Sequence, residues 1–214
     1  MRDWRILHKQ IMVDFILYLN SVSDKFVLKG GTSLMFCYGL TRFSEDIDLD
    51  GMDKKFFSYV DQFIIRYRPK YGELTYRKAQ DTDTCKRVFI HFGQEKPLKV
   101  EVSYRDRVDI CFCTYVNGIL VYDIESLMIK KINAFSHRDK IRDLYDVTFI
   151  YWHYKNQLGI RTIQSLRDVV AFKGLEQFDF LIKDQRDPLI NNNELAAAWC
   201  RRLSTTVCRF SIRR

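Results

Sequence analysis

A glycine pair followed by closely spaced carboxylates constrains this chain more than any other feature. Residues 26–50 read FVLKGGTSLMFCYGLTRFSEDIDLD. An apolar start, Gly30-Gly31 and an acidic end predict the order strand, glycine turn, helix, loop, strand. Glycine permits a tight turn and lets a ligand approach the backbone closely. The helix offers unpaired N–H groups and its positive dipole end, so the turn is predicted to bind a phosphate.

Two carboxylates close this stretch on one side of the predicted strand. Asp46 and Asp48 alternate with Ile47 and Leu49, and the period of two in a strand puts both carboxylates on one face. Adjacent carboxylates repel unless a cation lies between them. Mg²⁺ takes hard oxygen ligands and shares them with substrate phosphates. The pattern therefore predicts a site for Mg²⁺, or Mn²⁺ in its place.

A calcium loop is the main competing interpretation of the acidic residues. Asp46-x-Asp48-x-Asp50-Gly51 matches the opening of an EF-hand. That loop requires a bidentate Glu at its twelfth position, where this chain has Phe57. We therefore reject the EF-hand.

Composition favours a globular protein with a polyanionic partner. The length of 214 residues suits one domain, or one domain with an appendage, and the 47% hydrophobic content can build a core. The formal net charge of +8 favours attraction to a polyanion such as nucleic acid. The six cysteines form no CxxC pair, so a zinc site is not expected. We see no secretory signal and no membrane-spanning stretch. These features predict free thiols in the cytoplasm and no membrane partner.

The remaining pattern predicts a mixed α/β fold of the α+β type. We expect an α/β core over residues 1–122, with a mixed, mostly antiparallel sheet, and a helical part over 123–214 packed on it. Asn117-Gly118 is expected to join a hairpin. The expected helices are 3–20, 54–68 (closed by Pro69 and Gly72), 124–134, 140–154, 162–172 and 175–182, and the expected strands are 74–77, 87–92, 98–104, 108–115 and 119–121.

A third carboxylate lies on one of these strands. Glu101 is flanked by Val100 and Val102, and beside the Asp-x-Asp strand it would complete a three-carboxylate metal site. Two divalent ions held in this way clamp the attacking and leaving oxygens of phosphoryl or nucleotidyl transfer. We expect Lys99 to share the side of Glu101 only through strand twist, and assign it no role.

A basic segment at 128–147 is a candidate for neutralising phosphate charge. Lys131, Arg138 and Arg142 are spaced by seven and four residues, so they share one face if the helix is continuous. Arg142 and Asp146 stand at i and i+4, and a surface ion pair is the alternative. Asp143 and Asp146 could equally orient the basic groups from behind.

Two separated motifs carry a resemblance to a known family. Lys29-Gly30-Gly31-Thr32-Ser33-Leu34 and the later 42–49 run, RFSEDIDL, look like the signature of the AbiEii/AbiGii toxin family, in the DNA polymerase β-like nucleotidyltransferase superfamily. The 131–146 run, with Lys131, Arg138 and Arg142-Asp143-Leu144-Tyr145-Asp146, resembles the family's fourth motif in order and spacing. The similarity covers about residues 10–155.

The resemblance implies a fold, an activity and site roles. The fold would be a nucleotidyltransferase core with a helical C-terminal part. Asp46, Asp48 and Glu101 would hold Mg²⁺, and a nucleoside triphosphate would be the substrate. The residues implied to contact the nucleotide are Lys29, Gly30, Gly31, Thr32, Ser33, Arg42, Ser44, Arg138 and Arg142, while Lys131 would contact phosphate and Asp143 would support the site.

The sequence thus predicts an Mg²⁺-dependent nucleotidyltransferase that moves a nucleoside monophosphate to an acceptor, and a toxin-like role with a cognate antitoxin. The net charge and the arginine-rich tail from Glu194 suggest an RNA end as the acceptor. The resemblance implies the acceptor end of tRNA as one example, because some members of the family transfer nucleotides to it. Two alternatives stay open. One is a non-catalytic nucleotide- or nucleic-acid-binding module on the same fold, and the other is a kinase-like phosphotransferase.

Overall fold

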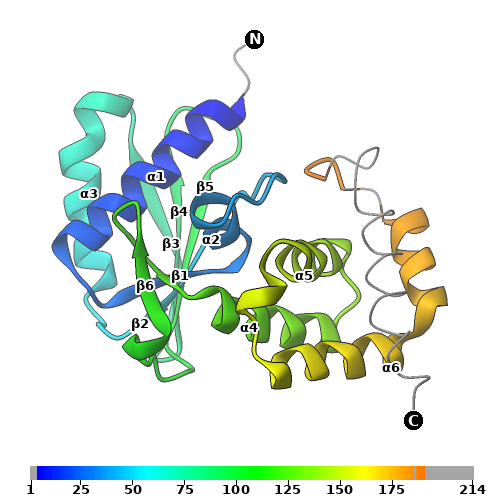
Figure 1. Cartoon of the computed structure of the whole chain (residues 1–214). Helices are drawn as coiled ribbons and strands as arrows, with labels where there is room; N and C mark the ends of the chain where they lie inside the picture. The colour runs from blue at the N-terminus through cyan, green and yellow to red at the C-terminus, as the bar shows by residue number, and fades with distance from the viewer. Residues whose placement is uncertain (1–3, 186, 191–214) are drawn as a thin grey trace. The chain divides into compact units, whose positions relative to one another are not determined.

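The computed structural model describes residues 4–185 and 187–190 (Figure 1). The chain divides into two compact units. Unit 1 comprises Met1–Cys37 and Ser44–Tyr122, and unit 2 comprises Tyr38–Phe43 and Asp123–Arg214. The basic tail from Glu194, with Cys200 and Cys208, lies outside the described residues.

Unit 1 is built on one seven-stranded sheet in the order β3-β4-β5-β2-β1-β7-β6. β2 runs parallel to β5, and β1 runs parallel to β7, whereas the other neighbours are antiparallel. The predicted mixed, mostly antiparallel sheet is therefore confirmed. The strands are β1 (Phe26–Lys29), β2 (Ile47–Gly51), β3 (Thr75–Asp81), β4 (Cys85–His91), β5 (Leu98–Ser103), β6 (Cys113–Val116) and β7 (Ile119–Tyr122).

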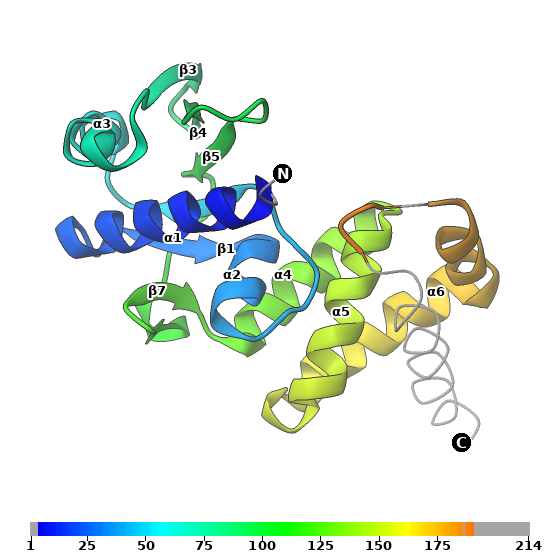
Figure 2. The ribbon, with the colours of Figure 1, turned by 90° about the horizontal axis from the view of Figure 1, so that it is seen from above.

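Two helices cover the apolar face of this sheet. α1 (Trp4–Val22) and α3 (Phe56–Tyr71) pack together through the Phe15 and Phe63 rings, whose centroids are 5.0 Å apart. The ring of Phe26 on β1 meets that of Phe56 on α3 at 6.0 Å. Figure 2 shows α1 crossing the central strands. Burial of these rings stabilises the side of the sheet that carries Phe26 and Leu28.

The opposite face of the same strands is polar. The register pairs Lys29 with Asp48 and Asp48 with Glu101, and side chains that are Cα partners on neighbouring strands point to the same face. Ile47 and Leu49 are buried on the other side. The period of two in the sequence thus separates the hydrophobic core from a charged surface within one sheet.

The stretch at 26–51 folds in the predicted order. β1 ends at Lys29, and α2 (Gly30–Cys37) begins at once. A loop then leads to β2, and residues 38–43 of this loop belong to unit 2. The glycine turn at the end of β1 therefore lies next to the acidic strand β2, because β1 and β2 are paired.

Unit 2 is helical in its described part. Its helices are α4 (Ile124–His137), α5 (Ile141–Tyr154) and α6 (Ile160–Asp184). Ten residues of α5 are buried. The Tyr154 hydroxyl donates to the carbonyl oxygen of Tyr38 at 2.7 Å, which ties the 38–43 segment to α5.

Several local predictions need correction. Pro69 lies inside α3, and only Gly72 caps it. By contrast, the predicted break between the helices at 162–172 and 175–182 is confirmed, because α6 consists of two helices separated by a kink at Gly174, where φ is +73°. Cys111 lies in a short 3₁₀ turn, Ile110–Phe112, so the predicted strand at 108–115 begins only at Cys113.

The hairpin at Asn117-Gly118 is confirmed, with β6 antiparallel to β7. The four described cysteines, at positions 37, 85, 111 and 113, are free thiols, as predicted. Within the described residues, no helix has the length and apolar character needed to cross a bilayer.

Candidate active site

The glycine turn stands directly against the acidic strand. Gly30 has φ +79°, a left-handed conformation that favours glycine. A β-carbon built on Gly30 would lie 2.9 Å from Oδ2 of Asp48. The missing side chain at Gly30 therefore leaves room for this carboxylate oxygen at the N-terminus of α2, where phosphate is predicted to bind.

Hydroxyl groups of this stretch brace the backbone. Ser33 Oγ donates to the carbonyl oxygen of Gly30 at 2.7 Å. Thr32 Oγ1 bonds to the carbonyl oxygen of Asp46 and lies 2.9 Å from Ser44 Oγ. Thr32 and Ser33 are buried. These contacts fix the turn to the segment that enters β2.

The three predicted acidic residues influence one another. Asp48 and Glu101 are direct register partners on β2 and β5, and Asp46 immediately precedes β2. Burial raises the pKa of Asp48, and the negative charges of Asp46 and Glu101 raise it further, against the nearby ammonium group of Lys99. Burial, together with the neighbouring carboxylates, therefore disfavours the charged form of Asp48.

Two basic side chains occupy the same polar face. Lys99 Nζ lies 2.9 Å from Oδ2 of Asp46. Arg87, on β4, holds Oε2 of Glu101 at 2.7 Å. Burial lowers the pKa of Lys99, but the hydrogen bond to Asp46 and the charges of Asp46, Asp48 and Glu101 outweigh it and raise the pKa overall. Lys99 thus forms an ion pair with Asp46, and the charges of Asp48 and Glu101 also stabilise its protonated form.

The described residues offer no group of three or more His, Cys, Asp and Glu side chains arranged to hold a metal ion. The ion pairs give the physical reason, because Asp46 and Glu101 each face a cation. Asp48 has no ion pair among the described residues. Its Oδ2 lies beside the glycine turn at Gly30.

A buried ion pair adjoins the site on the same face. Asp50 is fully buried and pairs with Lys29, and the Tyr122 hydroxyl donates to its Oδ2 at 2.9 Å. Burial and the charge of Asp50 raise the pKa of Tyr122, so its hydroxyl stays protonated and donates. Lys29 was predicted to contact nucleotide, but here its ammonium group is held by Asp50.

Unit 2 has a polar centre of its own around Asp146. Arg42 donates from Nε and Nη2 to the two oxygens of Asp146, at 2.7 and 2.6 Å. Lys131 Nζ lies 2.7 Å from Oδ2 of the same carboxylate. Burial opposes the charge of Asp146, but Lys131 and Arg42 outweigh it and lower its pKa. Asp146 is therefore a buried anion that fixes two of the predicted basic site residues.

The other predicted residues of unit 2 also form ion pairs. Arg138 donates to both oxygens of buried Asp143, at 2.6 and 2.9 Å. Arg142 pairs with Asp187, so the alternative of an i, i+4 ion pair with Asp146 is not formed. Arg138 has extended backbone between α4 and α5. The helix is therefore not continuous, and the single basic face predicted from the spacing is not formed.

The predicted residues thus fall into two groups. Unit 1 brings together Lys29, Gly30, Gly31, Thr32, Ser33, Ser44, Asp46, Asp48 and Glu101. Unit 2 holds Arg42, Lys131, Arg138, Arg142 and Asp143.

In unit 1, sequence reasoning assigned no site role to four residues that lie at the site, three in contact with predicted residues and Tyr122 in contact with Asp50. They are Lys99, Arg87, Asp50 and Tyr122. The alternation of a strand could have found Lys99, because residues 99 and 101 share a face without any twist. It could also have found Asp50, two residues after Asp48. No sequence signal links Arg87 or Tyr122 to the site, since pairing between distant strands brings them there.

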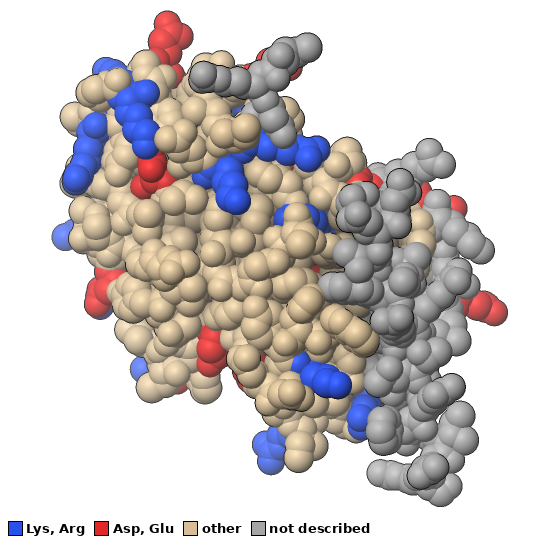
Figure 3. Space-filling model, turned by 45° about the horizontal axis from the view of Figure 1, so that its top comes forward, with Lys and Arg blue, Asp and Glu red and all other residues tan. Residues whose placement is uncertain are grey.

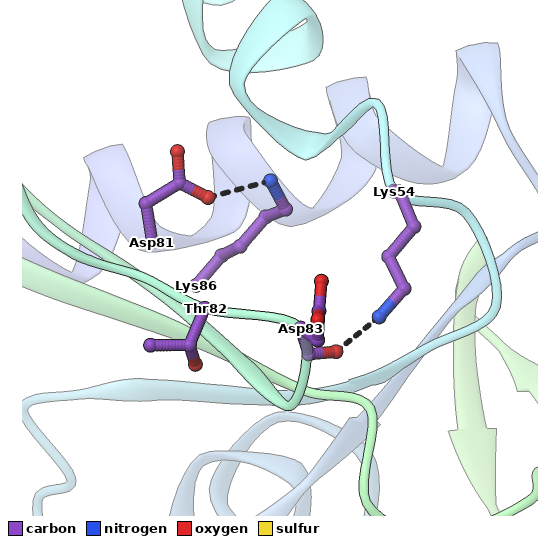
Figure 4. Close-up of a pocket in the computed structure, with 5 residues that line it drawn as sticks. All are labelled: Lys54, Asp81, Thr82, Asp83 and Lys86. Carbon is purple, nitrogen blue, oxygen red and sulfur yellow. Dashed lines mark hydrogen bonds and ion pairs between the residues drawn. The ribbon is translucent and has the colours of Figure 1, made fainter.

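A separate hollow lies at the turn between β3 and β4 (Figure 4). Lys86 Nζ pairs with Asp81 at 2.8 Å, and Lys54 donates to the carbonyl oxygen of Asp83. Thr82 completes the lining shown, and none of the predicted site residues takes part. This hollow is distinct from the glycine turn.

Solved structures of other proteins share the fold of this chain. The structure of JHP933 from Helicobacter pylori is 26% identical in sequence, with a TM-score of 0.80 over 98% of this chain and 92% of that one. MenT4, a nucleotidyltransferase toxin from Mycobacterium tuberculosis, shares the fold at 17% identity and a TM-score of 0.54, over 95% of this chain and 83% of that one. No curated protein matches the chain.

The family described as "Nucleotidyl transferase AbiEii toxin, Type IV TA system" matches residues 10–207. The match spans both units and includes the glycine turn, the acidic strand and the basic residues of α4 and α5. The chain belongs to this family of toxin nucleotidyltransferases, as its two motifs predicted.

Proposed function

We propose that this toxin-like nucleotidyltransferase moves a nucleoside monophosphate from a triphosphate to a hydroxyl of an RNA end, with a divalent metal ion bound by its carboxylates. The observation that carries the proposal is the 2.9 Å separation between a β-carbon built on Gly30 and Oδ2 of Asp48. A phosphate-binding turn and a metal-binding carboxylate in contact suit a metal–triphosphate complex, which presents both groups at once.

The residues of unit 1 fit a divalent ion. Their donors are carboxylate oxygens, which Mg²⁺ and Mn²⁺ prefer, and the ammonium group of Lys99 already stands in for a cation beside Asp46. Asp46 and Asp48 would hold the ion. Glu101 would be the third acidic ligand, and it must share or release Arg87 to act as one. A bound divalent ion supplies charge stabilisation for the phosphate oxygens and lowers the pKa of a coordinated hydroxyl.

The transfer itself is an in-line displacement. The acceptor oxygen forms a bond to the α-phosphorus, the bond from that phosphorus to the β-bridging oxygen breaks, and pyrophosphate leaves. The hydroxyl proton passes to solvent or to a site carboxylate. The chain contributes positioning and charge, with the first N–H groups of α2 orienting the phosphates and Thr32 and Ser33 keeping the turn rigid.

In unit 2 we assign Lys131 to phosphate binding, as the family resemblance implies. Asp146 orients its ammonium group. Arg42 uses Nε and Nη2 on Asp146, so we assign it to holding Asp146 and Lys131 in place. Asp143 orients Arg138 in the same way, but the side chains of Arg138 and Arg142 are 57% and 41% exposed, whereas that of Arg42 is 3% exposed, so Arg138 and Arg142 are further candidates for phosphate contact.

Charge supports RNA as the acceptor. The chain carries +8 formally, and counter-ion release from a nucleic acid favours binding to such a protein. The face drawn in Figure 3 displays its basic side chains in several groups, with acidic ones between them. The type IV toxin–antitoxin description of the family supports an antitoxin made in the same cell as a second partner.

The test is transfer of label from α-³²P nucleoside triphosphates to total RNA in the presence of Mg²⁺, with γ-³²P donors in parallel. We expect α-label on an RNA species with wild type and none with Asp48→Asn. Lys86→Met, whose lysine lies in the separate hollow, is the control and should transfer normally.

Each other outcome selects another function. Transfer of the γ-label would identify a kinase-like phosphotransferase. Nucleotide binding that is equal in wild type and Asp48→Asn, with no transfer of either label, would identify a binding module. Harmless overproduction in bacteria would contradict the toxin role.

A further inference from the structure

We propose that Lys99 is a built-in cation of the active site, and that its ammonium group takes the place of one of the two divalent ions commonly used in nucleotidyl transfer. The protein would then hold a single divalent ion at Asp46 and Asp48. This inference rests on the proposed function.

Strand register places Lys99 beside Asp46, on the face that also carries Asp48 and Glu101. β2 and β5 are parallel, with Ile47 opposite Val100 and Asp48 opposite Glu101. One step earlier on each strand, Asp46 stands beside Lys99, and Lys99 Nζ lies 2.9 Å from Asp46 Oδ2. The ammonium group thus comes from the strand that also carries the third acidic residue.

A second divalent ion would compete with this ammonium group. Two-metal sites hold their ions about 3.5–4 Å apart, bridged by shared carboxylates. Here the carboxylate of Asp46 already contacts one positive charge, and Glu101 contacts another from Arg87. Another ion at Asp46 would therefore either displace Lys99 or bear strong repulsion from it.

Asp48 differs from both neighbours in a way that suits one ion. It has no ion pair among the described residues, and its Oδ2 faces the glycine turn rather than a basic side chain. One divalent ion at Asp48, shared with Asp46, would leave Lys99 and Arg87 where they are. This face of the sheet would thus hold one divalent ion at Asp48, while the ammonium group of Lys99 supplies the second positive charge beside Asp46.

The experiment counts bound Mn²⁺ in the full chain by electron paramagnetic resonance and isothermal titration calorimetry. Wild type should bind one Mn²⁺ per chain and show no spin-coupled pair. Lys99→Met should bind a second Mn²⁺, and should bind the first about tenfold tighter, because one nearby positive charge is gone.

Lys86→Met is the matched control, since Lys86 also projects from a strand of this sheet and pairs with an aspartate at 2.8 Å. It should bind one ion, as wild type does. Asp48→Asn should lose the ion in the wild-type background, which locates it at this site. Circular dichroism checks that each variant folds.

If the wild-type protein binds two Mn²⁺ ions or a spin-coupled pair, this measurement alone overturns the inference. The proposed function would remain intact. An unchanged count of one in folded Lys99→Met would also overturn it. No ion at all in wild type would contradict the metal-dependent function as well, so the two failures are distinguishable.

Discussion

Gly30 and Asp48 are so close that residue 30 has no room for a side chain. A β-carbon there would lie 2.9 Å from Oδ2 of Asp48, and the backbone has φ +79°. The glycine thus serves two purposes, since it makes the turn and it keeps a carboxylate oxygen open. The two purposes can be separated by experiment.

Gly30→Ala should lose both stability and activity. A side chain at this φ costs about 1–2 kcal/mol, and the contact with Asp48 adds steric conflict at the proposed metal ligand. Gly39→Ala is the matched control, with φ +78° and no neighbouring atom within 4 Å of a β-carbon placed there. Urea unfolding and α-label transfer measure the two effects. Full transfer by a folded Gly30→Ala protein would argue against a ligand role for that oxygen.

Asp48→Asn should stabilise the metal-free protein while abolishing transfer. The pKa of Asp48 is raised by burial and by Asp46 and Glu101, so its charge opposes folding at neutral pH. We expect a gain of about 0.5–2 kcal/mol in the free energy of unfolding, as is common when a functional charge is neutralised.

Asp46→Asn is the contrast for this prediction, because it loses the ion pair with Lys99 and should gain no stability. Adding Mg²⁺ should raise the melting temperature of wild type, but not of either variant. Destabilisation by Asp48→Asn in the absence of metal would show that the carboxylates do not repel one another as inferred.

Tyr122→Phe should destabilise unit 1 and weaken transfer. It removes the hydroxyl that donates to buried Asp50 at 2.9 Å, and hydrogen bonds to charged groups contribute about 1.5–3 kcal/mol. Lys29, which shares Asp50 and neighbours the turn, should then be less well positioned.

The control for this variant is Tyr76→Phe, which removes a 2.7 Å bond to Asp61 at an exposed position. Unfolding by urea should show little change for it. If both tyrosine variants behave alike in unfolding and in transfer, Asp50 and Tyr122 have no special role.

Asp146→Asn should destabilise unit 2 in a pH-dependent way. Losing one partner of a buried ion pair costs about 3–5 kcal/mol, and here Arg42 and Lys131 would both lose their carboxylate. The pKa of Asp146 is lowered in the folded protein. The contribution of Asp146 to the free energy of unfolding is therefore complete at pH values above its pKa in the unfolded chain, about 3.9. This contribution is lost as the pH falls through the lower pKa of the folded protein.

Urea unfolding at pH 7, 5 and 3 measures this difference, which should be largest at pH 7 and 5 and smaller at pH 3. Asp168→Asn, at an exposed position on α6, should show no such trend. A difference that grows on acidification would mean that Asp146 is protonated in the folded protein.

The sequence alone determined the local elements and the family. The turn at Gly30-Gly31 depends on the φ values open to glycine, and the alternation at 46–49 depends on the period of a strand. Both properties belong to the local sequence and need no contact with a distant segment. The same holds for the helices and the hairpin at Asn117-Gly118. Their boundaries moved by a few residues where capping rather than composition decides them, as at Pro69.

Only the tertiary structure decided which charges meet. Lys99 faces Asp46 because β5 pairs in parallel with β2, Arg87 reaches Glu101 from β4, and Arg42 joins Asp146 across 104 positions of chain. Helical spacing left an ion pair between Arg142 and Asp146 open as an alternative, but the buried carboxylate instead pairs with Arg42 and Lys131. Ion pairs depend on distances of a few ångströms between remote segments, and the folding of the sheet and the helices sets those distances.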